Sequence, residues 1–346
     1  MILQIITAIA VALAAIWGLV WVFVRRMATW KPRDRTVKVT HADTHTITLE
    51  PGKYAGDPGE YILLLPDGSA RVGRPTVTGT SVTRDILTLT GTIPLGVVRM
   101  SPDPGPTPDI GGEFTDVIIP SPAGEMPAWL YGSESASWAI HVHGVRSSRL
   151  NTLWSIPGAA SAEHRSLVIA YRGSPDGPGS HRNAGLGYLE ASDVAAAIDF
   201  AVRNGAERIV LFGWSMGASA ALLAAEATLH RDRIAGIVMI APTLSWRHVM
   251  QAGAARMRMP KWVTAMVKYS ITSPALARLV GMPAPVDLDA LDWVSPRGRL
   301  KVPSLIFASR GDTNVPFDLT ARFAEANPGM VQVHEVVECT HGWEPN

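Results

Sequence analysis

Residues 209–225 read IVLFGWSMGASAALLAA. The first four are apolar and predict a buried strand, and the Ala-rich run over 216–227 predicts a helix. Ser215 falls on the turn between them, where a tight and strained backbone needs small residues on either side, and Gly213 and Gly217 supply them. Because the helix begins at the serine, its free N–H groups face the place where an oxyanion would develop. The stretch therefore predicts a nucleophilic serine at Ser215.

The sequence around this stretch alternates apolar runs with helical patterns. An opening pair of strands is predicted at 114–119 and 128–131. Further strands are predicted by the apolar runs at 138–143, 167–171, 234–241, 302–308 and 331–337. Residues 189–201 and 317–326 predict helices. Strands that are apolar throughout and alternate with helices indicate a mainly parallel sheet covered on both faces, so the predicted fold class is α/β.

The pattern breaks over about residues 243–295. Short helices are predicted at 246–255 and 262–271, and Pro274, Pro283 and Pro285 interrupt the remainder of the segment. An insertion of this size between two sheet strands predicts a helical cap over the strand ends.

A serine hydroxyl is a poor nucleophile without a base. His341 follows the last predicted strand and is the candidate base, and Asp312 follows the strand at 302–308 and is the candidate carboxylate that orients it. Glu335 and Glu338 are the alternative acids, and Asp193 is expected to be a structural or helix-surface carboxylate.

On these residues the chain resembles the α/β-hydrolase superfamily, in particular bacterial serine hydrolases of the esterase, lipase and prolyl-oligopeptidase-like type. The resemblance covers about residues 114–343. The motifs that carry it are His143-Gly144, Gly-Trp-Ser-Met-Gly at 213–217, Gly311-Asp312 and Thr340-His341-Gly342. The superfamily order of nucleophile, acid and histidine is met by Ser215, Asp312 and His341.

The resemblance implies the α/β-hydrolase fold and an oxyanion hole made of two backbone N–H groups, those of Met216 and Val145. It implies a serine hydrolase that cleaves a small-molecule carboxylic ester through an acyl-enzyme, with no cofactor and no metal. Two alternatives stay open: a prolyl-oligopeptidase-like serine peptidase, and a non-catalytic binding protein with the same fold. Superfamily members usually carry a final helix after the histidine, and the sequence ends at Asn346, so that helix is expected to be absent or truncated.

Charged side chains follow two of the predicted strands. Arg146 and Arg149 lie after the first, and Arg172, His181 and Arg182 lie after the next. They predict either a basic rim that favours an acidic substrate group or ordinary solvated loop charges.

Composition excludes several classes of protein. Apolar residues make up 47% of the 346 residues and charged residues 18%, which is not the composition of a disordered chain. The net charge of +1 gives no reason to expect nucleic acid as a partner. The single cysteine, Cys339, excludes an intrachain disulfide and cysteine-based metal sites, and no His-Glu-x-x-His motif occurs.

The N-terminal residues 1–24 carry no charged side chain. A helix over residues 2–24 would be about 35 Å long, enough to cross a hydrocarbon core of about 30 Å. A basic flank comes next, which predicts a single-pass transmembrane anchor over residues 1–30 with the catalytic domain in the cytoplasm. A cleaved signal peptide and a buried core helix are the alternatives.

A β-rich lead-in segment and linker is predicted over residues 31–112. Short strands at 36–40, 45–50 and 61–66 alternate with Pro-Gly and Asp-Gly turns, and residues 103–112 form a Pro/Gly linker. The catalytic domain is then expected over 113–346.

Overall fold

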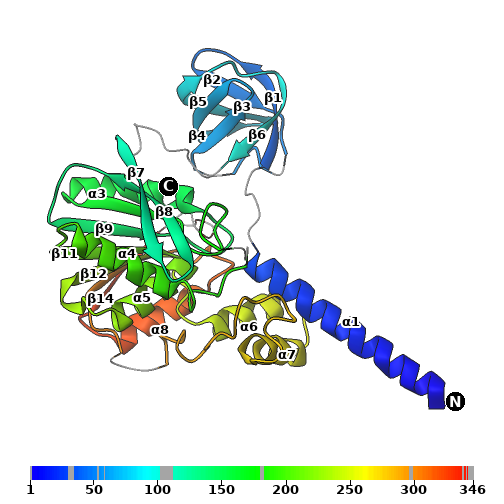
Figure 1. Cartoon of the computed structure of the whole chain (residues 1–346). Helices are drawn as coiled ribbons and strands as arrows, with labels where there is room; N and C mark the ends of the chain where they lie inside the picture. Colours follow the sequence, from blue (N-terminus) through cyan, green and yellow to red (C-terminus); the bar gives the residue numbers. More distant parts are fainter. Residues whose placement is uncertain are drawn as a thin grey trace.

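The computed structural model describes residues 2–29, 35–52, 54–57, 59–101, 112–179, 183–295, 299–336, 339 and 341. It consists of a long N-terminal helix, a small β-barrel and an α/β part (Figure 1). Most of the predicted linker at 103–112 lies outside the described residues.

The α/β part is built on an eight-stranded sheet. The strand order is β14-β13-β12-β11-β9-β10-β8-β7. The strands span β7 (Phe114–Ser121), β8 (Gly124–Tyr131), β9 (Ser137–Val142), β10 (Arg165–Ile169), β11 (Arg208–Trp214), β12 (Ile234–Ile240), β13 (Ser304–Ala308) and β14 (Val331–Glu335). β8 pairs antiparallel with both β7 and β10, and the remaining neighbours pair in parallel. The mainly parallel sheet predicted from the apolar runs is therefore confirmed.

Helices cover both faces of this sheet. The helices are α3 (Ile156–Ser161), α4 (Ala191–Arg203), α5 (Met216–Ala227) and α8 (Phe317–Ala326). α3 lies on one face, and α4 and α5 lie side by side on the other (Figure 1). The central strands β9 and β11 are buried between these layers, which is why their sequences are apolar without alternation.

The insertion after β12 forms two helices, α6 (Trp246–Arg256) and α7 (Lys261–Thr272), at the boundaries expected within a residue or two. They pack against each other, and α7 also contacts the N-terminal helix.

The β-rich segment is a closed barrel with strand order β1-β2-β5-β4-β3-β6. Its strands are β1 (Arg35–Ala42), β2 (Thr46–Leu49), β3 (Tyr61–Leu65), β4 (Gly68–Thr78), β5 (Ser81–Thr90) and β6 (Gly96–Ser101). The sequence predicted β1, β2 and β3 but assigned no separate strands to the three that come after them. Inside the barrel, the buried guanidinium of Arg84 donates to the carbonyl oxygens of Ala55, Gly59 and Gly73. These hydrogen bonds offset the cost of burying a cation in the barrel core.

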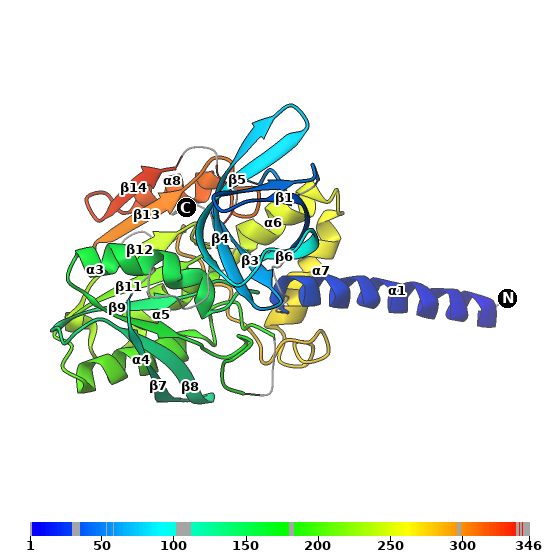
Figure 2. The same cartoon turned by 90° about the horizontal axis from the view of Figure 1, so that it is seen from above.

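Residues 2–28 form one helix, α1 (Ile2–Ala28). Within the part of the chain that the structure describes, no helix meets the length and apolarity needed to cross a bilayer, and the predicted transmembrane anchor is not supported. The last turns of α1 instead pack within the chain, because Val20, Val24 and Ala28 are fully buried in the same core as the sheet. Figure 2 shows this end of α1 beside the cap helix α7, with the N-terminus pointing away.

Candidate active site

Ser215 occupies a strained turn between β11 and α5. Its φ is 52°, a left-handed conformation that costs energy for any residue with a side chain. The flanking glycines are required by space. A Cβ on Gly213 would lie 2.5 Å from the Cα of Ala218, and a Cβ on Gly217 would lie 2.2 Å from the carbonyl oxygen of Val142. The turn therefore closes only with glycine at both positions.

Three side chains from distant parts of the sequence meet at this turn. His341 Nε2 lies 2.9 Å from Ser215 Oγ, and His341 Nδ1 lies 2.6 Å from Asp312 Oδ2. Asp312 is nearly buried, and its Oδ1 accepts the N–H groups of Asn314 and Val315 at 2.7 and 3.0 Å. The loop after β13 thus fixes the carboxylate, which leaves one oxygen for the imidazole.

Of the two alternative acids, the structure describes only Glu335, and it pairs elsewhere. Glu335 is on β14 and forms an ion pair with Arg310 at 2.7 Å. Glu338 lies outside the described residues.

The backbone near Ser215 offers hydrogen-bond donors. Met216 is the first residue of α5, so its N–H has no acceptor within the helix. The loop after β9 comes close to the turn, since a Cβ on Gly144 would lie 3.2 Å from the Cβ of Ser215, and Val145 lines the same cavity as Ser215. Both predicted oxyanion residues therefore flank the serine.

His143 orders this loop. Its ring stacks on Tyr171 with centroids 3.9 Å apart, and Nδ1 lies 2.9 Å from the Tyr171 hydroxyl. Burial lowers the pKa of His143 to about 4, so the ring is neutral near pH 7. A buried, stacked and neutral ring supports loop structure, and His341 remains the histidine in contact with the serine.

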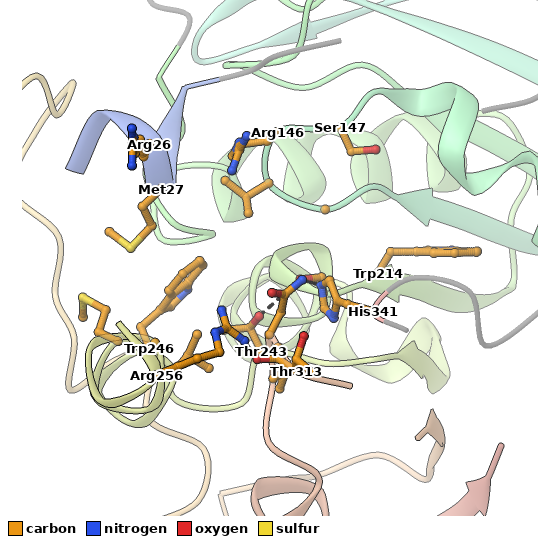
Figure 3. Close-up of a pocket in the computed structure, with 18 of the residues that line it drawn as sticks. Arg26, Met27, Arg146, Ser147, Trp214, Thr243, Trp246, Arg256, Thr313 and His341 are labelled. Atoms are coloured by element: carbon orange, nitrogen blue, oxygen red, sulfur yellow. Dashed lines mark hydrogen bonds between the residues drawn. The ribbon is translucent and has the colours of Figure 1, made fainter. Parts of the chain in front are cut away.

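A cavity of about 890 Å³ opens over Ser215 and His341 (Figure 3). That is within the range of ligand pockets. Sequence reasoning missed most of its walls, which come from α1 (Phe23, Arg26, Met27), the barrel (Arg35, Asp57, Tyr61) and the cap (Trp246, Met250, Arg256). No local sequence motif marks these residues, because they lie on separate segments that meet at the serine only in the folded chain.

Thr243 is a further residue that the sequence did not single out. Its backbone N–H donates to the carbonyl of Ser215 at 3.0 Å, and its Oγ1 lies 3.4 Å from Ser215 Oγ. It follows β12 directly and ties the end of that strand to the strained turn.

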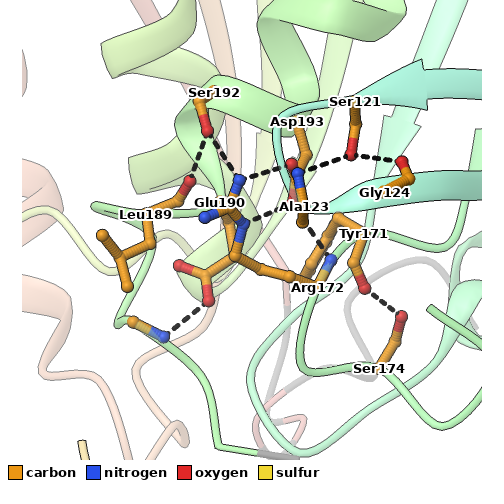
Figure 4. Close-up of polar contacts among 11 residues, drawn as sticks. Ser121, Ala123, Gly124, Tyr171, Arg172, Ser174, Leu189, Glu190, Ser192 and Asp193 are labelled. Atoms are coloured by element: carbon orange, nitrogen blue, oxygen red, sulfur yellow. Dashed lines mark hydrogen bonds and ion pairs between the residues drawn. The ribbon is translucent and has the colours of Figure 1, made fainter. Parts of the chain in front are cut away.

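Two of the five residues considered for a basic rim pair with carboxylates. Arg172 forms a bidentate pair with the fully buried Asp193, and Figure 4 shows this pair beside Glu190. Arg149 pairs with Asp176 at 2.7 Å and stacks on Trp129. His181 and Arg182 lie outside the described residues, and Arg146 lines the cavity.

Glu190 has a structural role at the same end of the sheet. Its carboxylate accepts the N–H groups of Gly185 and Gly187 at 2.6 and 2.8 Å, and burial raises its pKa to about 6. The chain from 185 to 187 is thereby held against α5, where a Cβ on Gly187 would lie 3.1 Å from the carbonyl of Met216.

Among the described residues, no group of three or more His, Cys, Asp or Glu side chains is arranged to hold a metal ion.

The model of an alpha/beta hydrolase family matches residues 139–344. Because the match spans more than half of the sequence and the sheet has the expected topology, the chain belongs to the alpha/beta hydrolase family. No curated protein is similar enough to match it.

Solved structures with the same fold include three at low sequence identity. An esterase of Pyrococcus furiosus is 20% identical, with 69% of this chain and 88% of that chain covered and a TM-score of 0.51. Est1E from Butyrivibrio proteoclasticus with bound ferulic acid is 16% identical, with coverage of 66% and 92% and a TM-score of 0.51. Mouse alpha/beta hydrolase domain-containing protein 10 is 17% identical, with coverage of 66% and 91% and a TM-score of 0.50. At these identities the likeness shows the shared fold alone.

Proposed function

We propose that the protein is a serine hydrolase that cleaves a carboxylic ester by acyl transfer to water. The observation that carries this proposal is the continuous hydrogen-bonded series from Asp312 through His341 to Ser215, with links of 2.6 and 2.9 Å. Separations of this length are those needed for proton transfer between a nucleophile and its base.

The reaction starts when Ser215 Oγ attacks the ester carbonyl and transfers its proton to His341 Nε2. The resulting imidazolium is stabilised by the Asp312 carboxylate, which also holds the ring in orientation. The N–H groups of Met216 and Val145 stabilise the oxyanion. His341 then protonates the departing alcohol, and water activated by the same imidazole releases the acid and restores Ser215.

An ester is favoured over a peptide because the described part of the N-terminal region has a different architecture from the one that suggested the peptidase alternative. The β-rich lead-in had suggested the prolyl-oligopeptidase-like type, whose additional domain is a propeller. In this chain the segment is a single closed barrel of six strands.

The test is labelling and turnover on the full chain. A fluorophosphonate should label Ser215, and p-nitrophenyl butyrate should be hydrolysed at least about 100-fold faster than the matched p-nitroanilide. Ser215→Ala should abolish labelling and lower kcat by about 10⁴-fold or more, since the nucleophile is lost. Ser161→Ala, at an exposed position of α3, is the control and should keep full activity.

Faster cleavage of the anilide would favour the peptidase. Ligand binding without labelling would favour a non-catalytic binding protein. Turnover that survives in Ser215→Ala would show that the reaction does not use this serine.

A further inference from the structure

The cavity over Ser215 is lined by arginines from four separate segments. Arg26 comes from α1, Arg35 from β1, Arg146 from the loop after β9, and Arg256 from α6. In Figure 3, Arg256 lies beside His341, Arg146 lies above them, and Arg26 lies at the end of α1. The chain as a whole carries a net charge of only +1, so this concentration of positive charge is local to the cavity.

Protein groups compensate only part of this charge. Arg35 pairs with Asp57, the one carboxylate among the described residues that line the cavity, and its guanidinium also donates to the Tyr61 hydroxyl. Arg256 donates to the carbonyl oxygen of Thr313, a neutral acceptor. Arg26 is exposed and makes no hydrogen bond or ion pair with another described residue. Among the described residues that line the cavity, no carboxylate therefore balances the charges of Arg26 and Arg256.

Apolar side chains line other parts of the cavity. Phe23 and Met27 of α1 contribute on one side, and Trp246 and Met250 of α6 contribute on another. Figure 3 shows Met27 pointing toward Trp246. Apolar side chains suit the acyl chain of an ester, because they bury hydrocarbon without unpaired polar groups. With the acyl chain on the apolar side chains, the arginines would contact the alcohol portion of the ester.

We propose that the substrate is an anionic ester, with an apolar acyl chain and a carboxylate or phosphate-type group on its alcohol portion, and that Arg26 of the N-terminal helix is one of the residues that recognise this group. The inference rests on the proposed hydrolase function and adds the substrate class. Positive charge at the mouth of a cleft raises the local concentration of an anionic substrate, and a direct contact selects it over a neutral analogue.

The experiment compares three octanoate esters that differ in charge. They are 4-carboxyphenyl, 4-phosphonophenyl and neutral 4-carbamoylphenyl octanoate, and kcat/KM is measured for each on the full chain. We expect at least one anionic ester to exceed the neutral ester by about tenfold at low salt, with the preference falling as salt screens the charges. Preference for the carboxylate or for the phosphonate tells which anion the arginines fit.

Variants of Arg26 and of its neighbour Arg25 distinguish direct recognition of the anionic group from a general effect of positive charge. Arg26→Gln should lower the anionic-to-neutral ratio of kcat/KM by about three- to fivefold, as expected for one partly exposed charge pair. Arg26→Lys keeps the charge and should retain most of the ratio. Arg25→Gln is the matched control, since Arg25 stacks on Trp21 at 4.8 Å and does not line the cavity, and it should leave the ratio unchanged.

The outcomes separate this inference from the function on which it rests. A wild-type ratio at or below one, or an equal loss of ratio in Arg25→Gln and Arg26→Gln, would overturn the anionic substrate while turnover of the neutral ester still supports the hydrolase. Absence of turnover of all three esters together with absence of fluorophosphonate labelling would overturn the hydrolase itself.

Discussion

The cavity has a floor and a roof of different origin. We define the floor as Gly144, Val145, Ser215 and His341, and the roof as Phe23, Arg26 and Met27 of α1 with Arg35, Asp57 and Tyr61 of the barrel. The floor lies within residues 139–344, which match the family, and the whole roof lies outside that match. The floor is held by short hydrogen bonds and by glycines with no room for a Cβ, whereas Arg26 is exposed. The difference teaches that one cavity is built from two kinds of segment: the floor belongs to the part of the chain that matches the family, and the roof comes from α1 and the barrel, which lie outside that match.

The largest expected effect tests Asp312, the carboxylate that contacts His341 of the floor. Asp312→Asn should lower kcat by about 10⁴-fold, because an amide would not stabilise the imidazolium and favours the wrong tautomer of His341. Steady-state kinetics on a p-nitrophenyl ester measures it. Glu335→Gln, which removes the acid paired with Arg310, is the control and should keep nearly full activity. The reverse result would transfer the role to Glu335.

The next effect tests Gly217, which lies two residues after Ser215 of the floor and has no room for a Cβ. Gly217→Ala places a Cβ 2.2 Å from the carbonyl oxygen of Val142, and the backbone must move to relieve the contact. We expect the free energy of unfolding to fall by about 1–3 kcal/mol, measured by urea denaturation, together with a loss of activity. Gly158→Ala is the matched control, since a Cβ there meets nothing within 4 Å and should leave stability unchanged or raise it by up to about 1 kcal/mol. Equal stability of the two variants would show that the turn does not depend on glycine at 217.

The smallest effect tests how the roof is held. Val24 is 1% exposed, and Val24→Ala should cost about 1 kcal/mol and increase amide hydrogen exchange in the last turns of α1. Val11→Ala, on the same helix but 64% exposed, should change stability by less than about 0.5 kcal/mol. If Val24→Ala changes stability and amide hydrogen exchange no more than Val11→Ala does, burial of Val24 in the core does not hold α1 in place at the cavity.

The sequence predicted the strand, turn and helix around Ser215 for a local reason. An apolar strand, a serine between two glycines and an Ala-rich helix are consecutive, so residues 209–225 specify their own geometry, and α5 begins and ends where the pattern predicts. The strand order along the sheet then brings Asp312 and His341 to the same edge, because carboxyl ends of parallel strands meet there.

The sequence alone could not show where α1 packs or which loop arginines are paired, because composition carries no information on contacts between distant residues. The apolar run of α1 predicted a membrane span, yet Val20, Val24 and Ala28 are buried in the core of the same chain. For Arg149 and Arg172 the sequence left a basic rim and solvated loop charges open, and in the fold both pair with carboxylates 27 and 21 positions further along the chain, Asp176 and Asp193. Charge in the sequence does not reveal which charges are paired in the fold.

The sequence by itself determined the α/β class, the strained serine turn and the order of serine, acid and histidine, because periodicity, glycine sterics and chain order are local or one-dimensional properties. Only the tertiary structure decided that Asp312 rather than Glu335 contacts His341, that α1 docks on the core, and that Arg26 and Arg256 share one cavity with Ser215. The physical reason is that these contacts join residues far apart in the chain, and burial and pairing select them only when the sheet, barrel and helix are packed together.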